Sequence, residues 1–359
     1  MEQKKILIIS TVGLIYDGIT SVIISYLKAM DLSGIQIYVA GTIAVEPKIK
    51  GQIEGLGCVV LDLPNRRKET LAYVLSLIDF IRKNKINVVH AHGNSGTLAI
   101  EMCTAWLGGC KKRIVHSHNT KCDQVKADRI FRPLMNLLYT DALACGEEAG
   151  KWLFEGRPFR VLKNGRDIKE YSFNQDKRDT IRKQYGIGDE IVIGHVGGFY
   201  EQKNHKFLVR IYRAIKKIEP NTRLFMIGDG PLRKEIEKES FDLDVIFTGA
   251  IDKVSDYLNA MDVMVLPSLF EGVPLVVLEW QINGLSSVLA DTISKECAVT
   301  NTVKYMSLNK TPEQWAEKIL KDRRKDRLLN SQAAIQNIMD AGFDIRDSAG
   351  LLRELYMMR

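Results

Sequence analysis

The chain has 359 residues, of which 45% are hydrophobic and 26% charged, and its formal net charge is +7. This composition is typical of a soluble globular protein and excludes a disordered or collagen-like chain, while the length favours two domains over one. The apolar run Ile6–Ile9 and its counterparts elsewhere are strand-sized, too short for a secretion signal or a membrane-spanning helix, so we expect a cytoplasmic protein.

Short β-rich runs alternate with amphipathic helical stretches through the first half of the chain. Continuous apolar runs are typical of parallel strands covered on both faces, and strands separated by helices form right-handed βαβ units. The predicted strands are 5–10, 35–41, 58–63, 87–92, 113–118, 142–146 and 159–164. The predicted helices are 19–30, 70–84, 95–107, 128–139 and 147–154. We therefore expect an α/β fold in which residues 1–168 form a Rossmann-like domain.

The same alternation restarts after a polar stretch that begins at Asn164. The predicted strands of this half are 190–196, 223–228, 245–249, 263–267 and 287–290, and its helices are 203–218, 231–239, 252–260 and 274–283. Residues 175–344 are therefore expected to form a second Rossmann-like domain. A last helix at about 345–359 could pack back on the first domain. The sequence alone does not show whether it does. Two such domains facing each other would leave a cleft at the carboxyl ends of both sheets, where open α/β sheets bind ligands.

The most informative stretch is residues 266–279, which read LPSLFEGVPLVVLE. A predicted strand ends at a glycine-containing turn, and a helix then begins with Pro274 in its first turn, a position that suits proline. The free N–H groups of a first helical turn favour negative charge. Taken singly, Glu271 is explained as a helix-entry acid favoured by the dipole and Glu279 as a solvated surface acid. Glu271 also stands where it would accept hydrogen bonds from sugar hydroxyls.

Together these residues resemble the E-x7-E motif of the retaining GT-B glycosyltransferases of family four. The resemblance covers essentially the whole chain. It extends to the segments GGFYEQKNH (197–205), IGDGP (227–231), FTG (247–249), DGI (17–19) and IVHSHN (114–119). It is strongest with enzymes that build capsular and exopolysaccharide repeat units. The resemblance implies a GT-B fold, with two facing Rossmann-like domains and an interdomain cleft. The first domain would bind the acceptor and the second the nucleotide-sugar donor.

The resemblance also implies a role for each matched residue. Lys203 would bind the donor diphosphate and stabilise charge on the leaving group, a role in which preorganised cations lower the barrier. Glu271 would contact the transferred sugar, and Glu279 would hold the ribose hydroxyls. His118 would lie near the sugar and the acceptor, and Gly18 would belong to a loop that approaches the phosphates. The remaining expected donor-binding residues are Gly197, Gly272, Val273 and Pro274.

Two positions depart from the family pattern. Gly198 stands where the family usually has an arginine, a second cation for the diphosphate. Asp17 replaces the first of two paired glycines and brings an acid close to the expected phosphates. Either Lys203 suffices, or Arg166 or another cation substitutes. Without its context, Lys203 would be read as an ordinary exposed lysine at the start of a helix.

Two HxH pairs offer an alternative of another class. His90 and His92 end one predicted strand and His116 and His118 end another, and a period of two puts both imidazoles of a pair on one face. This arrangement is expected of a metal-dependent hydrolase, although no carboxylate cluster completes a site. A non-catalytic nucleotide-sugar-binding protein also stays open because of Gly198. A dinucleotide-dependent oxidoreductase is excluded, because the first loop is not G-x-G-x-x-G.

From the resemblance we expect transfer, with retention, of a hexose or amino-hexose from a nucleotide diphosphate sugar, most simply UDP-linked. The expected acceptor is a lipid-linked glycan in surface polysaccharide synthesis. Cations and backbone N–H groups would take the role of a metal, so no metal and no cofactor are expected. We expect no nucleic-acid partner.

Basic and apolar residues of the first half predict reversible binding to the anionic inner face of the cell membrane. The cations lie in Lys111-Lys112-Arg113 and between Lys126 and Arg132. They are followed by the apolar residues Leu134, Met135, Leu137, Leu138 and Tyr139. Each basic residue near such a surface contributes about 1 kcal/mol. The simpler interpretation of residues 128–139 is a core-packed helix with a basic outer face.

Overall fold

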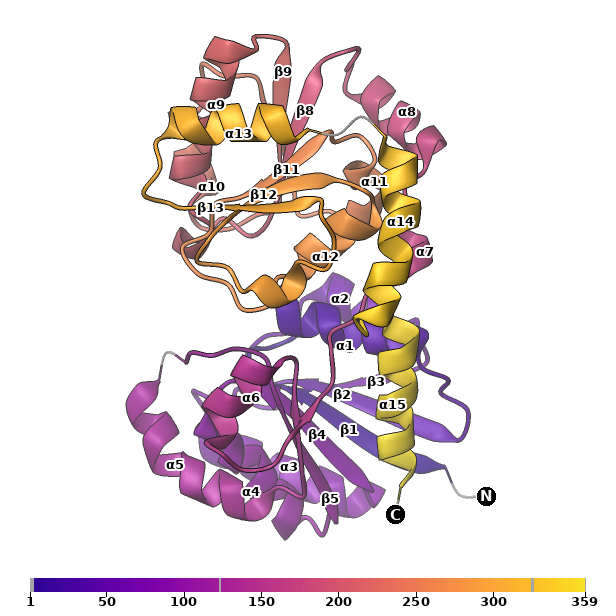
Figure 1. The fold of residues 1–359 in the computed structure, drawn as a ribbon. Helices are drawn as coiled ribbons and strands as arrows, with labels where there is room; N and C mark the ends of the chain where they lie inside the picture. Colours follow the sequence, from indigo (N-terminus) through magenta and orange to yellow (C-terminus); the bar gives the residue numbers. More distant parts are fainter. Residues whose placement is uncertain (1–2, 123, 324–325, 359) are drawn as a thin grey trace. The chain divides into compact units, whose positions relative to one another are not determined.

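The computed structural model describes residues 3–122, 124–323 and 326–358. The chain divides into two compact units (Figure 1): unit 1 comprises Met1–Gly165 and Ile345–Arg359, and unit 2 comprises Arg166–Asp344. Each unit is built on one parallel β-sheet with helices between its strands. The α/β class expected from the sequence is therefore confirmed. The first change of unit falls at Gly165/Arg166, within the polar stretch that interrupts the sequence pattern.

Unit 1 contains a seven-stranded sheet of order β3-β2-β1-β4-β5-β6-β7. Its strands are β1 (Lys4–Ser10), β2 (Ile35–Gly41), β3 (Val59–Leu61), β4 (Val88–Gly93), β5 (Lys112–Ser117), β6 (Asp141–Ala144) and β7 (Arg160–Val161). Its helices are α1 (Gly18–Ala29), α2 (Pro47–Glu54), α3 (Thr70–Asn84), η1 (Gly96–Leu98), α4 (Ala99–Leu107), α5 (Val125–Leu138), α6 (Glu147–Phe154) and α15 (Ile345–Met357). Helix α15 contacts α1, so the last helix of the chain completes unit 1.

The two faces of this sheet carry different side chains. Val89 of β4 and its parallel neighbours pack in one hydrophobic cluster with residues of α3 and α4. Because side chains alternate along a strand, His90 and His92 lie on the opposite face. There the His90 ring is hydrogen-bonded to Tyr356 of α15. The polar residues of β4 therefore lie on the side of the sheet that α15 covers.

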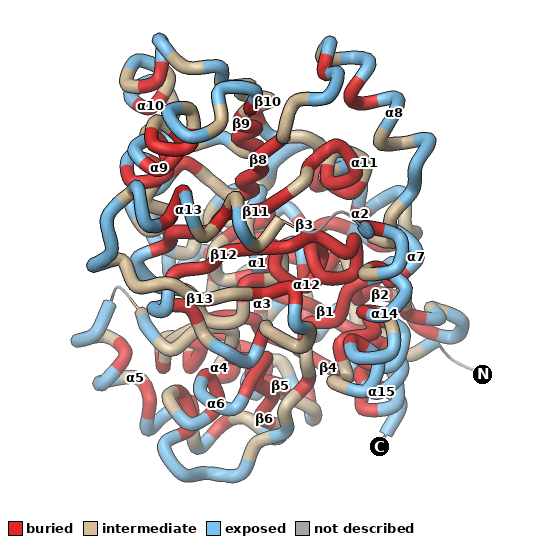
Figure 2. The backbone as a smooth tube through the Cα atoms, turned by 45° about the horizontal axis from the view of Figure 1, so that its top comes forward, coloured by how far each residue is buried: buried red, intermediate tan, exposed pale blue. Residues whose placement is uncertain are grey.

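Unit 2 contains a six-stranded sheet of order β10-β9-β8-β11-β12-β13. Its strands are β8 (Ile191–Val196), β9 (Thr222–Ile227), β10 (Val245–Gly249), β11 (Val263–Leu266), β12 (Ser286–Ala290) and β13 (Val303–Met306). Its helices are α7 (Ile168–Tyr171), α8 (Gln175–Gln184), η2 (Glu201–Lys203), α9 (His205–Ile218), α10 (Arg233–Glu239), α11 (Val254–Leu258), α12 (Leu275–Ile282), η3 (Lys295–Cys297), α13 (Pro312–Asp322) and α14 (Arg327–Asp340). Figure 2 shows buried segments, in red, following the strands, which is the pattern expected of parallel strands covered on both faces.

Every strand predicted from the sequence is present, but several elements were missed. These are α2, α7, α8, β13, η3, α13 and α14. Helix α2 buries only Ile49 and Ile53, so its apolar periodicity is weak. Strand β13 is only partly buried after its first residue, which removes the continuous apolar run that marks the other strands. None of the described helices is long and apolar enough to cross a membrane.

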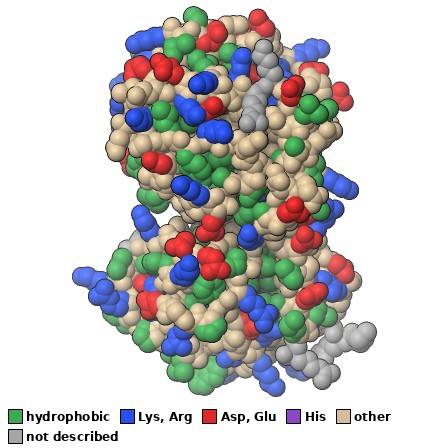
Figure 3. Space-filling model, viewed as in Figure 1, with side chains coloured by type: hydrophobic (Ala, Val, Ile, Leu, Met, Phe, Trp, Pro, Cys, Tyr) green, Lys and Arg blue, Asp and Glu red, His purple; other side chains and the backbone are tan. Residues whose placement is uncertain are grey.

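Charged side chains of both signs are interspersed over the face drawn in Figure 3. The net charge of +7 therefore does not gather into one basic surface on this face. A protein that follows a nucleic-acid backbone typically concentrates its cations in a patch or stripe. The absence of a nucleic-acid partner stays a prediction.

Candidate functional site

The candidate donor site lies where two strands of unit 2 leave the sheet in opposite directions. Strand β8 leads to β9 on one side of the sheet, and β11 leads to β12 on the other. Open α/β sheets bind ligands at such a switch point, outside the carboxyl ends of the strands. Gly197 directly follows β8, and Glu271 lies in the segment between β11 and α12. Two of the segments that resemble the family motifs therefore meet at this point of unit 2.

Lys203 and Glu271 form an ion pair across the switch point. Lys203 ends η2, and its Nζ lies 2.5 Å from Oε1 of Glu271. The two side chains are only 19% and 11% exposed. Lys203 is thus not the freely exposed helix-start lysine of the simpler interpretation. A cation and a carboxylate are therefore held side by side, in partial burial, at the switch point.

Glu279 is buried inside unit 2, which excludes the interpretation as a solvated surface acid. It is 6% exposed, on the inner side of α12. Its Oε1 accepts a hydrogen bond of 2.7 Å from Nε of Arg166, which is 2% exposed. Burial raises the pKa of Glu279, while Arg166 and the Tyr171 hydroxyl favour the ionised form and oppose that shift.

Arg166 was one candidate for a substitute cation at the diphosphate, but it is paired with Glu279. An acid among apolar helix neighbours needs such a partner, because an unpaired charge is almost never fully buried. Arg166, which follows β7, was the only feature of the sequence that pointed to this pair.

The glycines of this site leave room for other groups. A Cβ on Gly197 would lie 3.1 Å from Cε of Lys203, so glycine lets the lysine stem pass close to the backbone. A Cβ on Gly198 would lie 2.8 Å from a ring carbon of Tyr200, which is 54% exposed. An exposed aromatic ring therefore stands beside the place where the family carries its arginine.

The remaining expected donor residues form the turn into α12. Gly272 has no atom within 4 Å of an added Cβ, so this part of the turn is open. Val273 packs against the core of unit 2. Pro274 is the N-cap of α12 and not, as expected, a residue of its first turn.

In unit 1, Asp17 and Gly18 begin helix α1. Asp17 is the N-cap, and its Oδ1 accepts a hydrogen bond of 2.8 Å from N–H of Thr20. Burial raises the pKa of Asp17, and the Thr20 hydrogen bonds oppose this shift. The acid thus caps a helix, which explains its departure from glycine. An added Cβ on Gly18 would meet nothing within 4 Å, so this position is open on its outer side.

The histidines of both HxH pairs come together on one face of the unit 1 sheet. His92 and His116 are direct neighbours in the register of β4 and β5. His92 Nδ1 lies 2.8 Å from Nε2 of His118, and His90 Nε2 lies 3.2 Å from Nδ1 of His116. Burial lowers the pKa of all four, that of His118 to about 3, so the rings are neutral at physiological pH. The expectation that each pair shares a face is confirmed.

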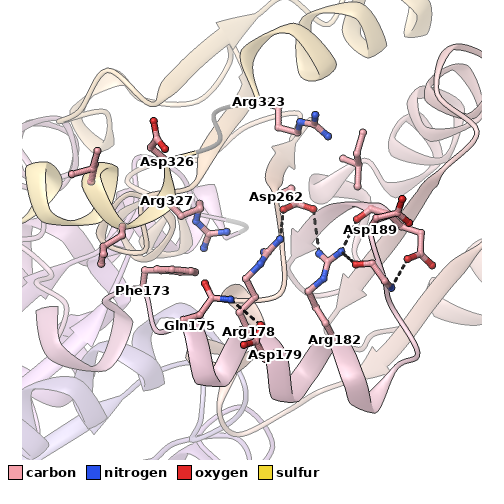
Figure 4. Close-up of a pocket in the computed structure, with 15 residues that line it drawn as sticks. Phe173, Gln175, Arg178, Asp179, Arg182, Asp189, Asp262, Arg323, Asp326 and Arg327 are labelled. Carbon is pink, nitrogen blue, oxygen red and sulfur yellow. Dashed lines mark hydrogen bonds and ion pairs between the residues drawn. The ribbon is translucent and has the colours of Figure 1, made fainter.

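A pocket of about 630 Å³ lies elsewhere in unit 2 and is a different feature (Figure 4). It is found beside Asp262, which directly precedes β11, and thus at the amino end of the sheet. Arg178 and Arg182 both bond to the Asp262 carboxylate, at 2.7 and 3.4 Å. Arg182 also donates to the carbonyl oxygens of Gly188 and Glu190. These arginines hold α8 against the sheet, and the pocket lies at the opposite end from the donor-binding candidates.

Sequence comparisons place this chain among glycosyltransferases. Residues 190–321 match the family described as "Glycosyl transferases group 1". EpsF of Bacillus subtilis, which carries a provisional glycosyltransferase name, is 31% identical over 99% of this chain and 97% of its own length. An Escherichia coli enzyme, UDP-Gal:alpha-D-GlcNAc-diphosphoundecaprenol alpha-1,3-galactosyltransferase, is 25% identical over 79% of this chain and 78% of its own. The metal-dependent hydrolase alternative finds no support among these relatives.

Solved structures share the fold at lower sequence identity. Anabaena HepE in complex with UDP and glucose aligns with a TM-score of 0.80 at 17% identity, over 98% of this chain and 99% of HepE. WaaG, a glycosyltransferase involved in lipopolysaccharide biosynthesis, aligns with a TM-score of 0.75 at 15% identity, over 99% of this chain and 100% of WaaG. The two parallel-sheet units match the GT-B fold of such enzymes, as expected from the sequence. The chain belongs to the group 1 glycosyltransferases.

Proposed function

We propose that this glycosyltransferase moves a hexose or amino-hexose from a UDP-linked donor to a lipid-linked glycan in the synthesis of a surface polysaccharide. The observation that carries the proposal is the Lys203–Glu271 pair at the switch point of unit 2. The UDP complex of HepE and the UDP-galactose donor in the name of the Escherichia coli relative support the choice of nucleotide. A capsular polysaccharide glycosyltransferase of Staphylococcus aureus, CapH, is 22% identical over 90% of this chain and supports the pathway class.

In the proposed reaction the bond between the sugar C1 and the diphosphate oxygen breaks, and a bond to an acceptor hydroxyl oxygen forms. Negative charge develops on the departing diphosphate, and the ammonium group of Lys203 stabilises it. Glu271 accepts hydrogen bonds from the sugar hydroxyls once the donor has drawn Lys203 toward the phosphates. Glu279 holds the ribose hydroxyls, and His118 of unit 1 lies near the sugar and the acceptor. The acceptor hydroxyl gives its proton to the departing diphosphate oxygen as UDP leaves.

We propose that transfer retains the anomeric configuration and needs no metal. The resemblance to retaining enzymes supports retention. Lys203 and the open turn at Gly272 support a site in which a cation and backbone N–H groups replace a metal. The anomeric proton coupling of the product, measured by NMR at early times, tests retention. An inverted product would contradict it.

The direct test of the function is turnover with a panel of UDP- and GDP-sugars, each with a diphosphoundecaprenol-linked sugar or the free sugar as acceptor. We expect one UDP-sugar to give product, and the lipid-linked acceptor to be preferred. Thermal stabilisation by each donor identifies the ligand independently of turnover. Stabilisation by a UDP-sugar without any transfer would favour the alternative, a non-catalytic nucleotide-sugar-binding protein. Product from GDP-sugars alone would contradict the choice of UDP.

Helix α5 of unit 1 supports attachment to a membrane. Lys126 and Arg129 are exposed on α5 and are followed, on the same side of the helix, by Ile130, Leu134 and Leu137, which are 72%, 40% and 80% exposed. A helix that presents cations and apolar side chains together is suited to the interface of an anionic bilayer. We propose that this stripe binds the inner face of the cell membrane, where a lipid-linked acceptor would be found.

Part of the membrane-binding surface expected from the sequence is buried or hydrogen-bonded within unit 1. Met135 and Leu138 are buried in unit 1. Lys112 donates to the carbonyl oxygen of Leu355, and Arg113 donates to that of Leu138. The simpler interpretation of α5 as a core-packed helix therefore holds for its inner side and not for its outer stripe.

Sedimentation with liposomes tests the membrane proposal. We expect binding to vesicles that contain anionic lipid, and loss of binding at high salt because exposed charges are screened within about 8 Å at physiological ionic strength. Leu137→Asp should weaken binding, while Leu71→Asp should not, although Leu71 on α3 is also 72% exposed. A wild-type protein that stays in the supernatant under every condition would contradict attachment and leave the transfer reaction untouched.

A further inference from the structure

Three buried histidines of unit 1, all except His118, form a compact group that the proposed transfer reaction does not use. His90, His92 and His116 are each 1% exposed or less. Each offers a ring nitrogen, and these three nitrogens all lie within 4.8 Å of one another. They come from two adjacent strands, β4 and β5, so the sheet itself fixes their backbone positions.

The spacing of the nitrogens is close to that of a metal site. A tetrahedral zinc ion with bonds of about 2.0–2.1 Å holds its nitrogen ligands about 3.3 Å apart. Nε2 of His90 and Nδ1 of His116 are already 3.2 Å apart. The ring nitrogen that His92 offers lies within 4.8 Å of the other two, and among the described hydrogen bonds its Nδ1 is held only by His118.

The surroundings of the three rings also suit a metal site. The other nitrogen of His90 is 2.6 Å from the hydroxyl of Tyr356, a contact that orients the ring as second-shell partners do around bound metals. Nε2 of His116 is buried and has no hydrogen-bond partner among the described residues, so no other contact fixes which nitrogen of this ring carries the proton while Nδ1 faces His90. The Ser10 hydroxyl, which neighbours His92 across the β1–β4 register, is likewise buried and unpartnered. Buried polar atoms are rarely left without a partner unless the site has another occupant or role.

We propose that His90, His92 and His116 form a binding site for one first-row transition-metal ion, with Zn²⁺ as the reference ion. Neutral imidazoles suit zinc, copper and nickel, and three of them leave a fourth position for water. The site revises the expectation of no metal for this group. It is separate from the Lys203–Glu271 pair of unit 2, and none of its three ligands takes part in the proposed transfer.

The test is metal binding by the full-length chain, prepared free of metal. Calorimetry with Zn²⁺ and visible absorption with Co²⁺ should each show one ion per chain, and the Co²⁺ spectrum should be that of a tetrahedral nitrogen site. His116→Gln and His92→Gln should each weaken binding at least tenfold. His195→Gln is the matched control, because His195 is an equally buried imidazole of unit 2, and it should bind as the wild type does.

The wild-type measurements decide the proposal even if a variant fails to fold. No heat with Zn²⁺ and no change of the Co²⁺ spectrum, in a chain that is folded by circular dichroism, would overturn it. An octahedral Co²⁺ spectrum would do the same, because it indicates oxygen ligands of an adventitious surface site. Unchanged stoichiometry and affinity in folded His116→Gln and His92→Gln would also overturn it.

Discussion

The two units share a topology but differ in the side chains at the carboxyl ends of their strands, which are charged in unit 2 and mostly neutral in unit 1. Unit 2 carries two ion pairs near its switch point, Lys203–Glu271 and Arg166–Glu279. Unit 1 carries four neutral imidazoles there, and its one acid at the α1 entry, Asp17, is used as a helix cap. The fold therefore supplies equivalent positions in the two units, and the residues at those positions decide which unit suits a charged diphosphate.

Mild acid should produce the largest difference between the two units, because it should destabilise unit 1 more than unit 2. A buried histidine whose pKa is lowered stays neutral when folded, so below the unfolded pKa of about 6.5 the unfolded chain binds more protons. The contribution of these neutral histidines to the free energy of unfolding is therefore fully present above pH 6.5. It is lost as the pH falls below 6.5, by up to about 1.4 kcal/mol per pH unit for each such histidine. Unit 1 has four of them, whereas unit 2 has His195 and His205, whose pKa values burial lowers to about 4 and about 2.

Hydrogen exchange between pH 7 and pH 5 measures this difference. We expect protection to be lost from the strands of unit 1 before those of unit 2. Earlier loss from unit 2 would show that the imidazole array does not dominate acid sensitivity.

Breaking the buried pair of unit 2 should have the next largest effect. Glu279→Ala leaves Arg166 buried without its carboxylate, and removal of one partner of a buried pair costs about 3–5 kcal/mol. The same variant should raise the dissociation constant of UDP, because the ribose loses its proposed partner. Urea denaturation and calorimetry with UDP measure the two effects.

The double variant Arg166→Met/Glu279→Leu is the control for this experiment. It should recover part of the stability, because no unpaired charge remains, and none of the UDP affinity. Full UDP affinity in a folded double variant would remove Glu279 from the donor site.

Lys203→Ala should lower turnover by about 2–4 kcal/mol of transition-state stabilisation, since no arginine stands at Gly198 to share the charge. Lys206→Ala is the matched control, because Lys206 lies on α9 close in sequence and pairs with Glu235 at the surface. Steady-state kinetics of both variants decide the point. Equal rates for Lys203→Ala and Lys206→Ala would exclude Lys203 from the mechanism.

Glu271→Ala should lower turnover far more than UDP affinity, because its proposed partner is the sugar and not the nucleotide. This result would distinguish it from Glu279→Ala, for which affinity falls. Calorimetry with free UDP gives the affinity, and kinetics with the UDP-sugar gives the turnover. A loss of UDP affinity equal to that of Glu279→Ala would contradict the division of roles.

Gly198→Arg should tighten donor binding by about tenfold, the effect of one added hydrogen bond to a charged group. Gly198 has no left-handed backbone angle, and the group that an added Cβ meets is the exposed ring of Tyr200, which can move. Gly198→Ala controls for the displaced ring. Weaker binding for both variants would indicate that Tyr200 itself contacts the donor.

Chelators should leave transfer unchanged, even when a metal is removed from the histidines of unit 1. Turnover before and after treatment with EDTA, with metal content measured in parallel, tests this. Activity that disappears with the metal and returns with Zn²⁺ would contradict metal-independent transfer.

Most of the fold was predictable from the sequence because its signals are local. Continuous apolar runs such as Val263–Leu266 mark buried parallel strands, and all predicted strands were found. Helix α2 and strand β13 escaped because few of their residues are buried, which leaves little apolar periodicity to read.

The candidate site was predictable only as a set of positions. The sequence located Lys203, Glu271 and Glu279, but it did not show that Glu279 is buried against Arg166, a contact between residues 113 positions apart. In the same way, the period of two placed each HxH pair on one face, whereas the convergence of both pairs depends on the pairing of β4 with β5. Long-range pairing of this kind leaves no local pattern.

Hydrogen exchange of the full-length chain with and without UDP tests the central claim that unit 2 holds the nucleotide. We expect added protection in the segments that contain Gly197–Asn204 and Glu271–Glu279, and little change in β4 and β5 of unit 1. Protection confined to unit 1, or to the pocket beside Asp262, would contradict this assignment.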